Sequence, residues 1–226
     1  MSRARLAGLL RAAFAAALAA DLVALLAGSG TGHLLAKPLL MPLLAAYAAV
    51  RGAPRSLLAA LAFGWGGDVF LLVDAEWAFL AGMGSFAAGH VCYLLLFGRA
   101  RTSLPLGACY AAALVTAVAL LWGDLPADLR IPVAGYALLL TATAWRASSL
   151  GPVAGAGGAL FLLSDTLIAT GVAAWPQLPV PDFWIMLTYG AAQYLLTTGA
   201  LTPSSAGRPL PTGPVAATSP PARPRS

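Results

Sequence analysis

Two carboxylates lie inside apolar segments of the sequence. Asp68 stands in GWGGDVFLL and Asp165 stands in LFLLSDTLIAT. A charge within a membrane-spanning segment is costly, so such a residue marks a functional site by default. Two carboxyl groups can divide acid and base work, since one donates a proton while the other stabilises positive charge. The structural alternative is that each Asp only bonds a neighbouring helix.

Other polar side chains recur at helical spacing in the same kind of segment. His90 lies in AAGHVCY, and Tyr93 follows at i+3 on nearly the same face. Tyr189 and Gln193 are i,i+4 neighbours, so both can point at one cavity. These four side chains could orient carboxylates or water. Hydrogen bonding between helices is the alternative for each of them.

A cation and a hydroxyl complete the set of candidate residues. Lys37 precedes Pro38 and could attract a phosphate or a carboxylate, or extend to the membrane interface. Asp21 is a candidate partner for Lys37. Ser164 adjoins Asp165 and could bind or orient a substrate.

The depths of these groups in their helices allow them to meet. At about 1.5 Å per residue, Asp68 lies roughly 8 Å from the outer end of its helix, Asp165 and Tyr189 roughly 12 Å, and His90 roughly 18 Å. We therefore predict a polar cavity within the membrane.

Several common sites are missing from the sequence. His90 and Cys92 at i,i+2 point to different sides of a helix, and no HxxxH or CxxC occurs, so neither a metal nor a cofactor is expected. GSGTG at 28–32 lacks a following GK[ST] and is interpreted as an interhelical turn. No GxSxG nucleophile motif is present.

Composition indicates lipid as the surrounding solvent. Of 226 residues, 60% are apolar and 9% are charged, against about 25% charged in soluble domains. Backbone groups find no water in lipid, and the apolar runs lack the alternation of barrel strands, so helices are expected. We predict an all-α polytopic bundle of about eight helices, near 7–27, 36–50, 56–73, 78–97, 104–122, 131–147, 153–173 and 181–200.

Charge distribution predicts the orientation of this bundle. Arginines recur in every second loop, which places those loops and both termini in the cytoplasm by the positive-inside rule. The first segment could instead be a cleaved signal peptide. Residues 1–202 are expected to form the transmembrane domain of a multi-pass cell-membrane protein, and 203–226 a disordered, basic, Pro-rich tail. The scattered basic residues indicate no nucleic-acid partner.

Five segments carry a family resemblance. They are KPLLMPLL, FGWGGDVFLL, FLAGMGSFAAGHVCYLLLF, GGALFLLSDTLIA and LTYGAAQYLL, in this order. The chain from about residue 33 to 200 resembles the YhhN-like lysoplasmalogenase family of integral membrane vinyl-ether hydrolases. Ala36 departs from the pattern, because members often place a hydroxyl residue before Lys-Pro. Any anchoring of substrate by that hydroxyl is lost here.

The resemblance implies hydrolysis of the vinyl ether bond of a lysoplasmalogen, a lysophospholipid. The products are a fatty aldehyde and glycerophosphoethanolamine or glycerophosphocholine. The reaction starts with protonation of the β-carbon and forms an oxocarbenium-like cation, a problem that glycosidases also solve with two carboxyl groups. Asp68 and Asp165 are the predicted pair, and the sequence leaves open which one is the acid.

The remaining candidates have supporting roles in this hypothesis. His90 and Tyr189 orient the carboxylates or water, and Lys37 attracts the phosphate. Ser164, Gln193 and Tyr93 are further binding or orienting residues. The competing interpretations are a small proton-coupled transporter and a scaffold whose polar residues only join helices. The sequence does not indicate the natural head group or the oligomeric state.

Overall fold

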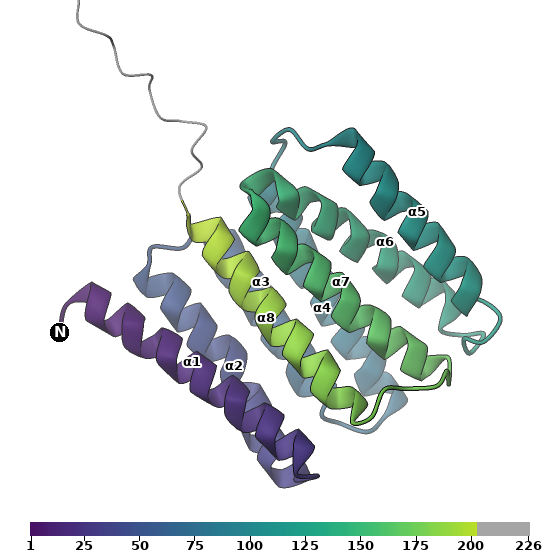
Figure 1. Ribbon diagram of the computed structural model, residues 1–226, viewed down its shortest axis with the longest axis horizontal. Coiled ribbons are helices and arrows are strands. Elements are labelled where there is room, and N and C mark those ends of the chain that lie inside the picture. The colour runs from purple at the N-terminus through teal and green to yellow at the C-terminus, as the bar shows by residue number, and fades with distance from the viewer. Residues whose placement is uncertain (203–226) are drawn as a thin grey trace, which may run out of the picture.

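The computed structural model describes residues 1–202 of the chain, which form a bundle of α-helices (Figure 1). The helices are α1 (Arg3–Leu26), α2 (Gly30–Val50), α3 (Arg55–Phe70), α4 (Glu76–Phe97), α5 (Leu104–Leu121), α6 (Arg130–Ala147), α7 (Pro152–Val172) and α8 (Pro181–Leu201), with one 3-10 turn, η1 (Ser148–Leu150). The predicted all-helical bundle is confirmed. The tail predicted at 203–226 lies outside the described residues.

The apolar character of the helices fits a membrane. Five of the eight, namely α1, α2, α4, α5 and α7, are long and apolar enough to span one. Of the others, α3 has 16 residues and packs on α2 and α4, while α8 packs on α7, α1 and α2. The chain is a multi-pass membrane protein.

The layout places α1 and α2 on one flank and α5 on the other, with α7 and α8 between them and α3 and α4 behind (Figure 1). The most extensive packing joins α7 to α8, α3 to α4 and α1 to α2. Small residues permit this close approach. A Cβ added at Gly157 of α7 would lie 2.7 Å from the backbone nitrogen of Leu196 in α8.

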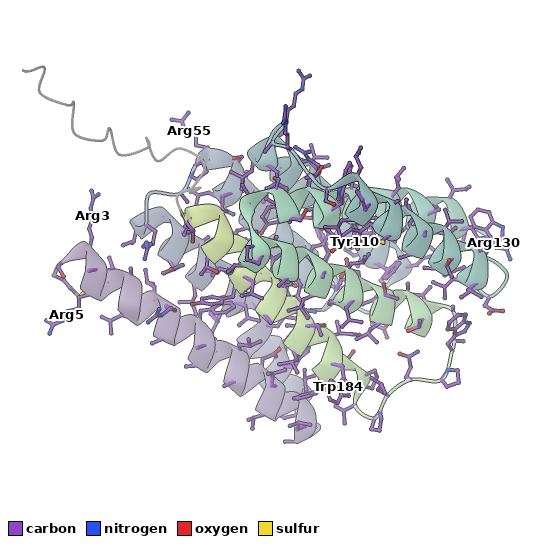
Figure 2. The ribbon with its side chains drawn as sticks, turned by 45° about the horizontal axis from the view of Figure 1, so that its top comes forward. Arg3, Arg5, Arg55, Tyr110, Arg130 and Trp184 are labelled. Carbon is purple, nitrogen blue, oxygen red and sulfur yellow. The ribbon has the colours of Figure 1, made fainter. Side chains whose placement is uncertain are left out.

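Arginines gather at helix ends, as the sequence suggests. Arg3, Arg5 and Arg55 lie toward one end of the bundle, and Arg130 and Trp184 lie toward the other (Figure 2). Which end faces the cytoplasm stays a prediction.

The start of α2 differs from the prediction. This helix begins at Gly30, with the Ser29 hydroxyl accepting a hydrogen bond from the Gly32 amide at 3.2 Å. Part of GSGTG is therefore helical, and the interpretation of 28–32 as a turn was wrong for 30–32. A capping serine compensates for the poor helix propensity of the glycines.

Two prolines inside α2 leave backbone carbonyls without their usual helical donors. Pro42 has no amide hydrogen to donate to the carbonyl of Pro38. The indole nitrogen of Trp65 in α3 donates to that carbonyl instead, at 2.9 Å. The gap in the hydrogen bonding of α2 thus joins it to α3 beside Lys37.

Candidate functional site

Asp68 lies at the end of a hydrogen-bonded chain that links three helices. The Tyr189 hydroxyl of α8 donates to Asp68 Oδ2 at 2.9 Å, and Gln193 Nε2 donates to the Tyr189 oxygen at 3.3 Å. The Tyr93 hydroxyl of α4 donates to Gln193 Oε1 at 2.7 Å. Asp68 is only 2% exposed. The contacts therefore fix the position of a buried carboxyl group.

Gly64, one helical turn before Asp68, makes room for this chain. A Cβ at Gly64 would lie 3.2 Å from Gln193 Nε2 and 3.5 Å from the Tyr189 hydroxyl. The absence of a side chain lets α8 bring its polar residues against α3. The GWGG sequence before Asp68 thus has a steric role in the site.

Asp165 belongs to a second hydrogen-bonded chain. The Tyr136 hydroxyl of α6 donates to Asp165 Oδ2, and His90 Nε2 of α4 lies 3.2 Å from the same hydroxyl. Since the Tyr136 hydrogen is used for Asp165, His90 must donate from Nε2. His90 Nδ1 is buried and has no hydrogen-bond partner within residues 1–202.

The two carboxyl groups line one cavity of about 70 Å³. We call it the carboxylate cavity. Its polar lining consists of Lys37, Asp68, Tyr136, Ser164, Asp165 and Tyr189. The other lining residues are apolar and come from several helices, including Phe86 of α4 and Ile168 of α7. This volume holds a few water molecules.

Lys37 supplies the positive charge of this cavity. Its side chain is buried to 8% exposure, and no carboxylate oxygen of the described residues lies within 4.0 Å of its ammonium. Lys37 nevertheless lines the same cavity as Asp68 and Asp165. A cation and two carboxyl groups therefore share a small, mostly apolar space.

The structure brings most of the predicted site residues together. Asp68, Asp165, Lys37, Ser164 and Tyr189 line the carboxylate cavity. The Ser164 hydroxyl donates to the Ile185 carbonyl at 3.1 Å, so it also joins α7 to α8.

Three predicted residues lie behind the cavity wall. Gln193 and Tyr93 reach Asp68 only through Tyr189, and His90 reaches Asp165 only through Tyr136. These residues can position the carboxyl groups without touching what the cavity holds.

Sequence reasoning missed two residues. Tyr136 contacts both Asp165 and His90, and the available signal was a single phenol in an otherwise apolar segment. His33 Nδ1 lies 2.7 Å from Asp21 Oδ1, so the suggested pairing of Asp21 with Lys37 was wrong. The early start of α2 explains this, because it places His33 on a helix beside the end of α1.

Metal ligands do not gather in the part of the chain that the structure describes. No group of three or more His, Cys, Asp or Glu side chains occurs there in an arrangement that could hold a metal ion.

The sequence is similar to curated proteins that are named lysoplasmalogenase. Human lysoplasmalogenase TMEM86B is 39% identical over 135 residues, which are 60% of this chain and 58% of the human protein. The lysoplasmalogenase of Mycobacterium bovis is 34% identical over 190 residues, which cover 75% of this chain and 72% of that protein. The chain thus spans less than two thirds of the human relative.

A protein-family model also matches the chain, whereas no solved structure does. The model of the YhhN family matches residues 32–200, a range that includes both carboxyl groups, Lys37 and nearly all of the chain from α2 to α8. The resemblance noted in the sequence is confirmed, and the chain belongs to the YhhN family.

Proposed function

We propose that this chain is a membrane-embedded hydrolase that cleaves the vinyl ether bond of lysoplasmalogens. The observation that carries the proposal is the cavity in which Asp68 and Asp165, from separate helices, meet beside Lys37. The names of the relatives support the same substrate class. The products are a fatty aldehyde and a glycerophospho head group.

The carboxyl pair suits this chemistry. A vinyl ether reacts when an acid protonates its β-carbon, which leaves an oxocarbenium cation that water attacks. One carboxyl group serves as the acid, and the other stabilises the cation and accepts a proton from the attacking water. The largely apolar lining strengthens both electrostatic interactions, because little water screens them.

The remaining polar residues have positioning and binding roles. Tyr189 holds Asp68, and Tyr136 with His90 holds Asp165, which fixes the direction of each carboxyl group. Lys37 has no carboxylate of the described residues within 4.0 Å, so its ammonium is available to the substrate phosphate. The cell membrane is the proposed location, with both termini in the cytoplasm.

Aldehyde release from purified protein tests the proposal. The substrates are lysophospholipids that differ only in the bond to the hydrocarbon chain: vinyl ether, alkyl ether or acyl ester. Only the vinyl ether has an alkene carbon to protonate, so it alone should yield aldehyde. Hydrolysis of the acyl lipid with no aldehyde from the vinyl ether would replace this proposal with an esterase.

Amide variants test the carboxyl groups. Asp68→Asn and Asp165→Asn should each lower turnover by about 100 to 10,000-fold, the usual contribution of a positioned acid or base. Melting temperatures in detergent serve as the control, because a purely structural Asp would lower stability instead. A transporter would move solute across liposomes and release no aldehyde.

A further inference from the structure

A second cavity of about 230 Å³ lies between α5, α6 and α7. We call it the chain slot. Most of its lining is apolar, including Ala113, Ala117, Ala134, Ala137, Leu140 and Leu162. An apolar cavity of about 150 Å³ is already large enough to bind benzene. The size and lining of the chain slot suit a hydrocarbon.

The chain slot and the carboxylate cavity share a wall. Asp165 and Tyr136 line both of them, whereas Asp68 and Lys37 line only the carboxylate cavity. Asp165 therefore stands at the junction between the cavity that also carries Asp68 and Lys37 and a larger cavity lined mostly by apolar side chains. An ester, ether or vinyl ether lipid has the same division between head group and chain.

The position of α5 gives the chain slot access to lipid. This helix lies on the outer flank of the bundle (Figure 1), packs mainly on α6 and buries only Leu121. The lining residues of α6 run from Arg130 to Thr141, which is roughly 16 Å along the helix axis. A chain can lie along α6 and enter from the bilayer beside α5.

We infer that the chain slot binds the alkenyl chain of the substrate and that Asp165 is the acid that protonates it. This inference rests on the proposed function. With the chain in the slot and the phosphate near Lys37, the alkene carbon that bears the chain lies on the Asp165 side. The ether oxygen then lies on the Asp68 side.

The first half of the reaction follows from this placement. The alkene electrons form a C–H bond with the Asp165 proton, and an oxygen lone pair forms the oxocarbenium double bond. The Asp68 carboxylate stabilises the cation and takes a proton from water as the water oxygen bonds to the cationic carbon. The product of this half is a hemiacetal, with Asp165 ionised and Asp68 protonated.

The second half restores both carboxyl groups. The hemiacetal hydroxyl gives its proton to Asp165, and the bond to the glycerol oxygen breaks as that oxygen takes the proton from Asp68. The net change is one water consumed, with an aldehyde and a glycerol hydroxyl formed. Tyr136 donates to Oδ2 of Asp165, so Oδ1, which has no partner among residues 1–202, is the oxygen that can carry the transferred proton.

Chain-length selectivity tests the slot. Ala117→Phe adds a ring to its lining, while Ala119→Phe adds the same ring to an exposed position of α5 outside it. With long-chain and short-chain vinyl ether lysolipids, the long-to-short ratio of kcat/KM should fall by about tenfold or more in Ala117→Phe, since a few blocked methylenes suffice. The Ala119→Phe variant should keep the wild-type ratio.

An equal ratio in Ala117→Phe and wild type, with aldehyde still released, would overturn the slot and leave the proposed function intact. Absence of aldehyde from the wild type would instead overturn the proposed function.

Cross-linking locates the chain without catalysis. The probe is an alkyl ether lysolipid with a diazirine at the end of its chain, added to wild-type protein in detergent. Mass spectrometry should find adducts on α5 and α6. Adducts on α1 and α8, which line a separate groove at Phe14 and Leu18, would contradict the inference.

The pH–rate profile tests which carboxyl group is the acid. In a bell-shaped profile of kcat/KM, the alkaline limb reports the group that must be protonated and the acidic limb the group that must be ionised. Tyr136→Phe changes the contacts of Asp165 and should move the alkaline limb. Tyr189→Phe changes the contacts of Asp68 and should move the acidic limb. The reverse pattern would assign the acid to Asp68.

Discussion

Gly67 offers a sharp test of the carboxylate cavity. This glycine precedes Asp68 in α3, and a Cβ built on it would lie 2.5 Å from ring carbons of Phe86 in α4. Carbon atoms pack at about 3.5 to 4.0 Å. The Phe86 ring must therefore move by about 1 Å or more in Gly67→Ala.

Phe86 has little freedom to move without disturbing the site. Its ring lines the carboxylate cavity and packs edge-on against Tyr189 and Phe161, with ring centroids 5.8 Å and 6.2 Å away. Tyr189 in turn holds Asp68. A displacement of about 1 Å in a positioned group can cost about 100-fold in rate, and we expect a loss of that order in kcat.

Aldehyde release and thermal melting in detergent are measured together for this variant. Overpacking costs about 1 to 3 kcal/mol, so Gly67→Ala should stay folded while losing most of its turnover. Gly84→Ala is the matched control, because a Cβ there meets no atom within 4 Å. Wild-type turnover in Gly67→Ala, or an equal loss in Gly84→Ala, would refute the reasoning.

Three further predictions use other contacts. Tyr189→Phe removes the donor to Asp68 Oδ2. Because a hydrogen bond to a charged group contributes about 1.5 to 3 kcal/mol, turnover should fall about 10 to 100-fold in the aldehyde assay. An effect smaller than threefold would show that Tyr189 does not position Asp68. His33→Leu leaves the fully buried Asp21 unpaired and should lower the free energy of unfolding in detergent by about 3 to 5 kcal/mol. Adding Asp21→Leu should restore most of that loss. A double variant as unstable as His33→Leu would contradict the stabilising role of the pair. The orientation of the bundle can be tested on intact cells with an impermeant thiol reagent and single-cysteine variants, Ala100→Cys and Ala127→Cys, in a background without Cys92 and Cys109. Only Ala127→Cys should react. Reaction of Ala100→Cys alone would show that the bundle has the opposite orientation.

The sequence predicts the helices well because lipid leaves the backbone few alternatives. Apolar segments of sufficient length must satisfy their own amides and carbonyls, so the helices follow from hydropathy. The boundary of α2 was missed because glycines and prolines at 28–42 suggest a turn and a late start. Contacts from Ser29 and Trp65 compensate for those residues, and neither contact can be read from local sequence.

The sequence predicted the ionisable residues of the site but not the hydrogen bonds that connect them. Asp68 and Asp165 stand out because a charge in an apolar segment is rare, whereas a phenol such as Tyr136 is ordinary there. Which side chains meet depends on the rotation of each helix about its axis. Glycines such as Gly64 set that packing, and their partners lie more than a hundred residues away in α8.

The link between Trp65 and the Pro38 carbonyl has a mechanical consequence. Trp65 is three residues from Asp68, and Pro38 adjoins Lys37, so the indole fastens the two helix segments that carry these opposite charges. If α2 tilts when a lipid arrives, α3 travels with it. The separation between the ammonium and the carboxyl group is then preserved.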